Sequence, residues 1–330
     1  MVLVLMNHDF IRRLEKTELA LVIGGRGFIG INLVKLLERV GYQVRVLSRY
    51  SYIKAGVTLT DMSCWTTGDI LNREDVEAAC EGVTTIFHLA NIAHVGSRDQ
   101  TDLHRVNVRG TEIIKECATS AGVSRLIYFS SALARDPGSS IYARSKFEAE
   151  KVLLQDYEVH NSANLHITIL RPTNVYGPSM KGNIAGLFRR IKRGELPILP
   201  VLKNRISLIS VNDLCRAALL AAHGSQESGE IYTLTDGELY TPNRIQDATY
   251  KALGRKKAGF RSPIMLFFAA SVVAHIANTL GVWRNDLGLR TFRNLVADKP
   301  IRCKKAESEL GFTPSETLET ALPLILKAIE

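Results

Sequence analysis

Three glycines at intervals of three residues, Gly24, Gly27 and Gly30, stand between an apolar run and a helical pattern. The apolar run, residues 19–25, has the length of a short buried strand and ends in glycine. Residues 28–41 then carry apolar side chains three and four positions apart, up to a glycine that predicts the helix end. A strand, a tight turn and a helix in direct succession constrain the fold, because parallel sheets are built from this unit.

The same alternation of strand-like and helical segments continues through the first half of the chain. Helical patterns such as residues 75–82 and 108–122 lie between short apolar runs. This alternation predicts a parallel sheet with helices on both faces, and such sheets bind ligands at the carboxyl ends of their strands. The further strand-like runs are residues 43–49, 64–70, 84–90, 125–131 and 166–172.

The glycine loop itself predicts a dinucleotide site. Glycine permits the tight turn, the close approach of a pyrophosphate to the backbone, and the packing of the helix on the sheet. The free N–H groups and the positive dipole end of the helix then face the phosphates. The cofactor contacts that we predict from this loop are those of Gly24, Gly27, Phe28, Ile29 and Gly30.

The ends of the second and third strands indicate which dinucleotide binds. A carboxylate at the end of the second strand would bond the free ribose hydroxyls, whereas an arginine there accommodates a 2′-phosphate. The chain has Ser48 and Arg49 and no acid, which favours NADP(H). NAD(H) is the alternative if Arg49 only stacks on the adenine. Asp69, followed by Ile70, ends the third strand and can bond the adenine amino group or cap the next helix.

After Pro178 the alternation weakens and the pattern becomes mostly helical. The sequence therefore predicts an α/β protein, with a Rossmann-type doubly wound parallel sheet and a smaller, mostly helical C-terminal substrate domain. We expect residues 17–178 to form the NAD(P)-binding domain, with residues 205–237 returning to its sheet. Residues 179–204 and 238–330 are expected to form the substrate-binding domain.

Tyr142 and Lys146 form the pair that most directly indicates chemistry. Their spacing of four residues places both side chains on the same face of a helix. A nearby ammonium group lowers the pKa of a phenol, which is ordinarily about 10. With Ser131 to orient a carbonyl or an alcohol, the phenol can give or take the proton that accompanies hydride transfer at a nicotinamide.

Together these motifs resemble those of the extended short-chain dehydrogenases/reductases, the group of nucleotide-sugar epimerases, dehydratases and reductases. The resemblance runs from about residue 19 to the C-terminus and is strongest to about residue 215. Besides the glycine loop, the tyrosine–lysine pair and Asp69, it rests on three runs, of which the last is specific to the extended group. These are HLAN at 88–91, VNVRGT at 106–111 and RPTNVYGP at 171–178.

The resemblance implies roles for further residues. The backbone of Leu89 and Ala90 would line the cofactor, and Pro172 would lie beside the nicotinamide. Asn107 would act in the catalytic group by supporting the active-site helix and a water. The catalytic trio would be Ser131, Tyr142 and Lys146, with the lysine also holding the nicotinamide ribose.

The substrate contacts are expected to come from Asn174 and Arg205. Many nucleotide-sugar members place a diphosphate-binding arginine just ahead of a VNDL-type strand. In this register Ile206 occupies that place, and Arg205 lies one residue early. A shift of one residue on a strand turns a side chain to the opposite face. Either a bulge restores the contact of Arg205, or the diphosphate is held more weakly.

Departures from the family pattern narrow the reaction. Members that dehydrate sugars carry an Asp-Glu pair where this chain has Ala132 and Leu133, so we discount dehydration. The preference for NADP(H) and the RPTNVYGP run favour a reductase of a 4-keto nucleotide sugar. Open alternatives are a nucleotide-sugar 4-epimerase that retains NAD and a 3β-hydroxysteroid-like or long-chain hydroxy-compound dehydrogenase. A redox-sensing NADP-binding regulator is a further alternative, although it has no need of Tyr142 and Lys146.

Charge and cysteine content bear on partners and compartment. The net charge is +9, but the basic residues are scattered, so we expect no nucleic-acid partner. The five cysteines form no C-x-x-C pair and no Cys/His metal spacing. This predicts reduced thiols in the cytoplasm and no metal site. The resemblance further implies a homodimer that pairs through helices at residues 111–122 and 144–155.

Residues 262–283 are nearly uncharged over about the length of a membrane-spanning helix. Arg261 and Arg284 flank this segment, and His275 and Asn278 lie within it. The segment is consistent with a largely buried helix over a substrate pocket, with a helix on a membrane surface, or with a membrane span. We favour the buried helix. Contact with the inner face of a membrane is the alternative that would make the protein peripheral.

Overall fold

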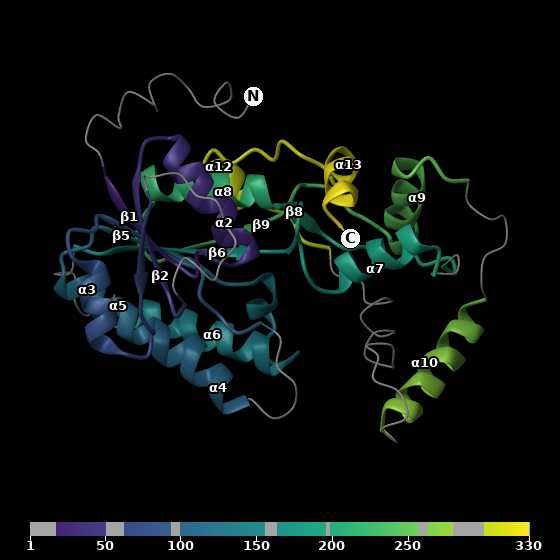
Figure 1. Ribbon diagram of the computed structural model, residues 1–330, viewed down its shortest axis with the longest axis horizontal. Coiled ribbons are helices and arrows are strands. Elements are labelled where there is room, and N and C mark those ends of the chain that lie inside the picture. The colour runs from purple at the N-terminus through teal and green to yellow at the C-terminus, as the bar shows by residue number, and fades with distance from the viewer. Residues whose placement is uncertain are drawn as a thin grey trace. The chain divides into compact units, whose positions relative to one another are not determined.

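The computed structural model describes residues 18–50, 63–93, 100–155, 164–195, 199–256, 263–279 and 300–329. Its main element is a seven-stranded sheet with the order β3-β2-β1-β4-β5-β6-β9 (Figure 1). All neighbouring strands in this sheet are parallel. The strands are β1 (Leu19–Ile23), β2 (Gln43–Ser48), β3 (Ser63–Thr67), β4 (Thr85–His88), β5 (Arg125–Phe129), β6 (His166–Pro172) and β9 (Glu230–Leu234).

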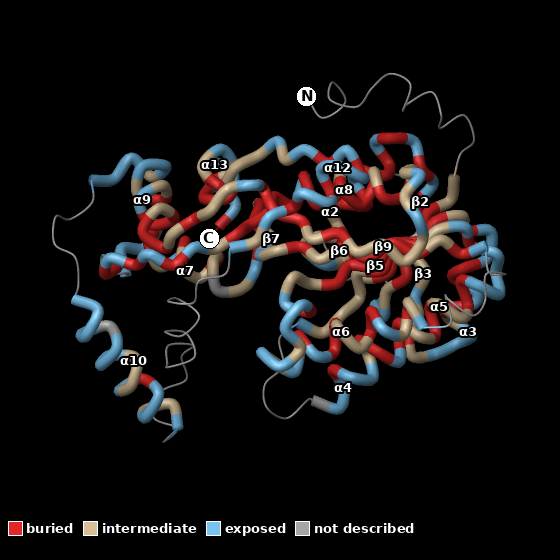
Figure 2. Tube along the Cα trace, turned by 180° about the vertical axis from the view of Figure 1, so that it is seen from behind, coloured by how far each residue is buried: buried red, intermediate tan, exposed pale blue. Residues whose placement is uncertain are grey.

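Helices cover both faces of the sheet, with α2, α8 and α12 on one face and α3, α5 and α6 on the other (Figures 1 and 2). This arrangement confirms the predicted doubly wound α/β fold. The strand order reverses between β1 and β4, which places a topological switch point at their carboxyl ends. The helices of this layer are α2 (Phe28–Arg39), α3 (Arg73–Cys80), α4 (Gln100–His104), η3 (Arg105–Arg109), α5 (Gly110–Ser120), η4 (Ala132–Arg135), α6 (Ile141–Leu154), α8 (Val211–His223) and α12 (Lys304–Glu309).

The central strands are apolar on both faces because helices cover both. In β1, the four residues from Ala20 to Ile23 are fully buried, and β4 is buried along its whole length. A continuous core forms where β1, β4 and β5 pack against α3 and α5. Burial of this kind fixes the strands rigidly, so that the loops at their carboxyl ends are held in place.

The chain divides into two compact units. The first unit comprises Met1–Pro172, Leu214–Leu234 and Cys303–Thr313. The second comprises Thr173–Asp213, Thr235–Arg302 and Pro314–Glu330. The boundaries therefore differ from those expected, since residues 173–178, 205–213 and 235–237 belong to the second unit and residues 303–313 to the first.

Contacts of α12 explain why residues 303–313 belong with the sheet. The phenol of Tyr232 on β9 donates a hydrogen bond of 2.9 Å to Glu309. Lys305 forms an ion pair with Glu230, and Phe312 is fully buried. Of the strand-like runs within 205–237, only β9 joins the main sheet, where it pairs with β6. The other, β8 (Leu208–Ser210), pairs with β7 (Asn174–Tyr176) in a separate two-stranded sheet.

The second unit is mostly helical. Its helices are α7 (Asn183–Arg193), α9 (Pro242–Ala252), α10 (Ile264–Thr279) and α13 (Leu318–Ala328). Asp236 lies buried in this unit and accepts hydrogen bonds from the phenols of Tyr176, at 3.0 Å, and Tyr240, at 2.7 Å. Burial raises the pKa of Asp236 to about 6, although these bonds act in the opposite direction.

Helix α10 is the described part of the segment 262–283. Most of its described residues are exposed (Figure 2), large apolar ones among them, and Ala274 is buried. The interpretation as a largely buried helix is therefore wrong. Among the residues that the structure describes, no helix has both the length and the apolar character needed to cross a membrane.

Candidate active site

The glycine loop adopts the close geometry that a dinucleotide site requires. Gly24 has a φ of +90°, and a Cβ atom on it would lie 2.7 Å from the backbone nitrogen of Ala90. A Cβ atom on Gly30 would overlap the carbonyl oxygen of Gly24. Gly27 closes the turn by donating its N–H to that same oxygen at 3.0 Å, and α2 begins at the next residue. The loop thus brings bare backbone and the N-terminus of α2 to the edge of the sheet, which fits a pyrophosphate.

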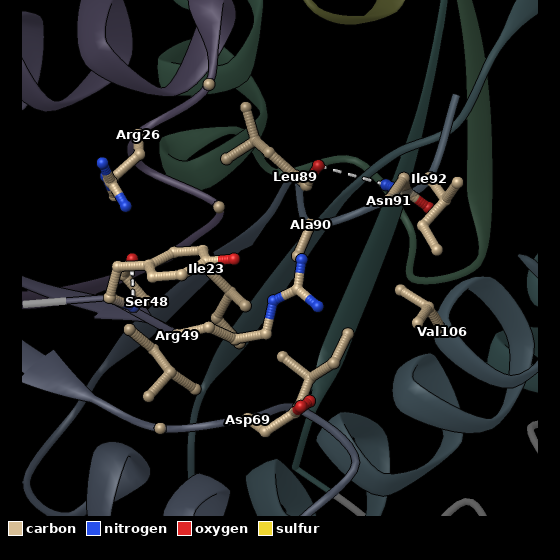
Figure 3. A pocket seen from close by; sticks show the side chains of 16 residues that line it. Ile23, Arg26, Ser48, Arg49, Asp69, Leu89, Ala90, Asn91, Ile92 and Val106 are labelled. Atoms are coloured by element: carbon tan, nitrogen blue, oxygen red, sulfur yellow. Dashed lines mark hydrogen bonds between the residues drawn. The ribbon is translucent and has the colours of Figure 1, made fainter. Parts of the chain in front are cut away.

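A cavity of about 330 Å³ opens at this edge, at the carboxyl ends of β1, β2, β3 and β4 (Figure 3). Seven of the predicted cofactor residues line it, while Phe28, Ile29, Gly30, Tyr142, Lys146 and Pro172 are not among its lining residues. Gly30 instead contributes the close approach just described. The seven lining residues that the sequence predicts are Gly24, Gly27, Arg49, Asp69, Ile70, Leu89 and Ala90.

The sequence did not single out Arg26, which lines one end of this cavity together with Ser48 and Arg49 (Figure 3). Both guanidinium groups lie over the ring of Tyr50, with the carbon of Arg26 at 5.2 Å and that of Arg49 at 6.0 Å from its centre. Two cations therefore flank the end of β2. Arg26 lies inside the glycine loop, and a basic residue at that position was the sequence feature that could have predicted its place in the cavity.

Asp69 also lines the cavity, and its carboxylate accepts a hydrogen bond of 3.0 Å from the N–H of Leu71. The alternative role as a helix cap belongs to Asn72, whose side chain accepts from the N–H groups of Glu74 and Asp75. Asp69 is thus held in a turn after β3 with its side chain at the cavity wall. This position is compatible with a contact to an adenine amino group.

Tyr142 lies in the first turn of α6, which Ser140 caps by accepting the N–H of Ala143 at 3.0 Å. Burial raises the pKa of the Tyr142 phenol to about 12, and the neighbouring Ser131 hydroxyl acts in the opposite direction. The effect of Lys146 on this phenol, which the sequence suggested, stays a prediction. At neutral pH this phenol is protonated and can donate.

Lys146 is buried one turn further along α6. Its Nζ atom donates hydrogen bonds to the carbonyl oxygen of Phe129, at 2.5 Å, and to the phenol oxygen of Tyr128, at 3.3 Å. Burial holds the pKa of Lys146 well below its ordinary value, and the charge of Glu150 acts in the opposite direction. A buried ammonium group is costly unless it is paired, so these neighbours determine its charge state.

Glu150 joins α6 to the strands on which the site depends. Its carboxylate accepts from the hydroxyl of Ser130 and forms a bidentate pair with Arg171, one bond of which measures 2.8 Å. Ser130 and Glu150 are buried, and the side chain of Arg171 is 16% exposed, so this pair is shielded from water. The RPTNVYGP run thus supplies an arginine that fixes α6 against β5 and β6.

Asn107 has the supporting position that the resemblance implies. It lies on the π-helix η3, where its amide oxygen accepts the N–H of Ile92 at 2.8 Å. Its amide nitrogen donates to the carbonyl of Ile92 at 3.1 Å and to the hydroxyl of Ser145 at 3.0 Å. Ser145 in turn donates to the carbonyl of Tyr142 at 2.9 Å. Asn107 therefore ties the loop after β4 to the start of α6.

His88 packs behind this site. It is fully buried, its Nε2 lies 2.9 Å from the hydroxyl of Thr111, and its ring centre lies 5.2 Å from that of Tyr128. Burial, with a smaller effect of Lys146, lowers the pKa of His88 to about 3, so it is neutral. Because Thr111 donates its proton to the carbonyl of Asn107 at 2.8 Å, the histidine carries its own proton on Nε2.

The two predicted substrate residues belong to the second unit. Asn174 is the first residue of β7 and is exposed. Arg205 is exposed as well, while Ile206 beside it forms an antiparallel bridge with Tyr240 through hydrogen bonds of 2.7 and 2.9 Å. Among the residues that the structure describes, no cluster of His, Cys, Asp and Glu could hold a metal ion.

Comparison with known proteins points in the same direction as this geometry. The family model for NAD-dependent epimerases/dehydratases matches residues 20–234. The chain is 28% identical to UDP-glucose 4-epimerase of Vibrio cholerae over 293 positions. The match covers 79% of this chain and 86% of that protein. It is also 28% identical, over 338 positions, to 3-beta-hydroxysteroid dehydrogenase of Mycolicibacterium neoaurum, with coverage of 92% and 88%.

Solved structures share the architecture. MoeE5 in complex with UDP-glucose and NAD matches 93% of this chain and 97% of its own, with a TM-score of 0.70 and 24% sequence identity. At that identity the likeness shows the fold. The UDP-glucose and NAD in that complex are ligands of MoeE5.

Proposed function

The chain belongs to the NAD-dependent epimerase/dehydratase family, that is, to the extended short-chain dehydrogenases/reductases, and from this premise we propose that it reduces a 4-keto nucleotide sugar with NADPH. Proteins of this family are oxidoreductases and epimerases that use a nicotinamide dinucleotide. The single observation that carries the proposal is the Tyr142 phenol, which lies one turn before Lys146 on α6 and whose pKa burial raises to about 12. Such a phenol is a proton donor at neutral pH, and reduction of a carbonyl needs a donor.

The proposed reaction assigns each polar group one task. Ser131 donates a hydrogen bond to the carbonyl oxygen and fixes its position. Tyr142 transfers its proton to that oxygen as the carbon becomes tetrahedral, so the product is a secondary alcohol. Lys146 offsets the negative charge that is left on the phenol. A dinucleotide held at the glycine loop would supply the hydride, with NADP⁺ as the second product.

The preference for NADP(H) draws support from the cations at the end of β2. Arg26 and Arg49 both line the cavity, and Ser48 adds a hydroxyl. None of the three is an acid that would repel a 2′-phosphate. Phosphate groups form strong charge-assisted hydrogen bonds with arginine, so this end of the cavity favours the phosphorylated cofactor.

A nucleotide sugar as substrate draws support from the relatives, since UDP-glucose 4-epimerase of Vibrio cholerae acts on one and MoeE5 was solved with one. Because Arg205 lies one residue before the position of the diphosphate-binding arginine, we expect a weak diphosphate contact there. Two alternatives stay in view. A 4-epimerase with retained NAD is favoured by the first relative, and a hydroxysteroid-like dehydrogenase by 3-beta-hydroxysteroid dehydrogenase, which matches 92% of this chain.

A homodimer and a cytoplasmic location complete the proposal. The physical sign of pairing would be an exposed apolar stripe on α5 and α6. Among the described residues, no large exposed apolar side chain lies on α5, and Ile141 is the one on α6. The dimer therefore rests on the family resemblance. None of the five cysteines forms a disulfide, which supports a reducing compartment.

The test begins with freshly purified protein that is denatured, so that any released nucleotide can be identified by mass. We expect no stoichiometric NAD, tighter binding of NADPH than of NADH, and consumption of NADPH with a UDP-linked 4-keto sugar. Stoichiometric NAD together with conversion of UDP-glucose into its 4-epimer would replace the proposal by the epimerase. Oxidation of a 3β-hydroxysteroid with NAD would replace it by the dehydrogenase.

A further inference from the structure

Helix α10 presents large apolar side chains to solvent. Met265, Leu266, Val273 and Ile276 are 74%, 63%, 57% and 52% exposed. At about 100° per residue, these four fall within one sector of about 100°, and we call them the apolar face of α10. Ile264 and Phe268 are also exposed, at 44% each, outside that sector. A helix this apolar is buried in a core or in lipid.

The opposite side of the C-terminal half of α10 is polar. Ser271, His275 and Asn278 are separated by four and three residues, so they share one side of the helix. None of them carries a fixed charge, and α10 contains no Asp, Glu, Lys or Arg. The helix is therefore apolar around most of its surface, with a short uncharged polar strip in its C-terminal half.

Over its described residues, α10 is shorter than a membrane crossing requires. Its 16 residues extend over about 24 Å, whereas the hydrocarbon core of a bilayer is about 30 Å thick. A helix of this length can lie in the plane of the membrane surface.

The charge around α10 identifies the kind of surface. Residues 248–285 include six basic residues and no acidic one. Arg255 and Lys256, which precede the helix, are exposed. An anionic leaflet attracts such a segment, whereas a second copy of this chain would bring the same positive charges together. The six basic residues are Lys251, Arg255, Lys256, Lys257, Arg261 and Arg284.

We propose that α10 anchors the protein to an anionic membrane surface, with its apolar face among the acyl chains and the flanking basic residues at the headgroups. This anchor is independent of the proposed reaction, because it depends on no residue of the candidate active site. It commits to lipid rather than to a second copy of this chain as the partner, because a second copy would bring like charges together whereas an anionic leaflet complements them.

The first test is flotation with vesicles of phosphatidylcholine alone and of phosphatidylcholine mixed with phosphatidylglycerol. We expect the full-length protein to float with the mixed vesicles at low salt, and to bind less as salt rises. Protein that stays unbound with the mixed vesicles at low salt would overturn the proposal. Equal binding to both vesicles at every salt concentration would overturn its electrostatic part.

Two matched double variants locate the contact. Met265→Glu/Leu266→Glu places acids on the apolar face, and we expect it to weaken vesicle binding about tenfold or more, since each buried apolar side chain contributes that much. Val201→Glu/Leu324→Glu changes two residues outside α10 that are 62% and 65% exposed, and should bind within about twofold of the parent protein. Equal losses in both variants would overturn the assignment to α10.

Two further readouts separate lipid from protein partners. Lys256→Glu/Lys257→Glu should weaken binding about fivefold or more per charge to mixed vesicles, with little change for phosphatidylcholine alone. The oligomeric state of Met265→Glu/Leu266→Glu should equal that of the parent. If that variant instead dissociates an oligomer and keeps its vesicle binding, α10 contacts a second copy and the proposal fails. NADPH affinity and unfolding temperature of each variant serve as the check on folding.

Discussion

The Nζ atom of Lys146 lies 3.3 Å from the phenol oxygen of Tyr128 and 4.7 Å from the centre of the same ring. Both side chains are buried, so water contributes little to stabilising the ammonium group. Its charged form depends instead on Tyr128, on the carbonyl of Phe129 and on Glu150. Tyr128 thus has the contacts of a positioning residue for Lys146, although no sequence motif indicated it.

Replacing Tyr128 by Phe removes the hydroxyl and leaves the ring. A hydrogen bond to a charged group contributes about 1.5–3 kcal/mol, so its loss should lower the pKa of Lys146 further. We expect kcat to fall about tenfold with little change in KM, and the high-pH limb of the rate profile to move to lower pH by about one unit.

Tyr232→Phe is the matched control for that change, because it removes a buried phenol on β9 that bonds to Glu309. It should lower stability by about 1 kcal/mol and leave the pH profile of kcat where it was. If Tyr128→Phe changes stability alone, as Tyr232→Phe does, then Tyr128 is structural and has no influence on Lys146.

Replacing Tyr142 by Phe removes the proposed proton donor. Turnover should fall by about 10²–10⁴-fold, the usual contribution of a positioned acid or base. Affinity for NADPH, measured by fluorescence titration, should stay within a few-fold of that of the parent. Tyr250→Phe is the same chemical change on α9 and should retain turnover. Activity that survives Tyr142→Phe would rule out the proton-transfer role.

Cofactor choice is tested by Arg49→Ser. Loss of one charge-assisted contact to a 2′-phosphate should weaken NADPH binding about tenfold or more, with little effect on NADH, which lacks that phosphate. Isothermal titration of both dinucleotides gives the two affinities. Arg189→Ser, on α7 in the second unit, should alter neither. An equal loss for both dinucleotides would mean that Arg49 only stacks on the adenine.

The glycine loop is tested by Gly24→Ala against Gly82→Ala. Both glycines have positive φ, +90° and +70°, so both substitutions incur a backbone cost of about 1–2 kcal/mol. A Cβ atom at Gly24 would also meet the backbone of Ala90, whereas nothing lies within 4 Å of one at Gly82. Gly24→Ala should therefore abolish NADPH binding and lower the unfolding temperature more than Gly82→Ala, which should retain NADPH binding. If both variants lose NADPH binding and unfolding temperature equally, the close approach of Gly24 to the backbone of Ala90 does not matter for binding.

Asp236 should make the stability of the second unit depend on pH. Its folded pKa of about 6 lies above the unfolded value of 3.8, so the folded state holds this proton more tightly. The stability that it contributes is fully present below pH 3.8 and is lost as pH rises through about 6. Two pKa units correspond to about 3 kcal/mol, an upper figure for this group.

Urea unfolding between these pH values measures the effect. Asp236→Asn, which cannot ionise but can still accept from Tyr176 or Tyr240, should remove most of the decline between the two pKa values. Asp102→Asn, at a side chain that is 58% exposed, is the control and should leave the decline in place. If the stability of Asp236→Asn falls by the same amount over this pH range, groups other than Asp236 cause the loss.

The sequence was sufficient for the nucleotide-binding half of the fold. Short strand-like runs marked β1 to β6, and the runs of β1, β4 and β5 are largely apolar because strands buried on both faces need apolar residues. The lining residues Arg49, Asp69 and Ala90 followed from their places at strand ends. Two contacts were not predicted. The first is local, because Asn72 rather than Asp69 caps α3. The second joins distant segments, because Arg171 pairs with Glu150 across 21 positions of sequence.

The second unit was harder to predict, for a physical reason. Apolar content alone cannot distinguish a helix that is buried from one that is exposed, so α10 was expected to be covered. The short run at β8 has the composition of a sheet strand, but its partner is the three-residue β7. The polar sequence of α12 did not predict that this helix packs beside β9. The contact is made by Glu309, which bonds to Tyr232, and by Lys305, which pairs with Glu230.

Five times along its length the chain passes from one compact unit to the other. The sheet-bearing unit therefore acquires its last segment, Cys303–Thr313, only after nearly all of the second unit has been synthesised. During translation, Tyr232 and its neighbours must wait for a partner that leaves the ribosome about 70 residues later, several seconds at ordinary elongation rates. Neither unit can be excised as a continuous fragment. A chimaera that exchanges the second unit between relatives would therefore need a junction at each of the five boundaries.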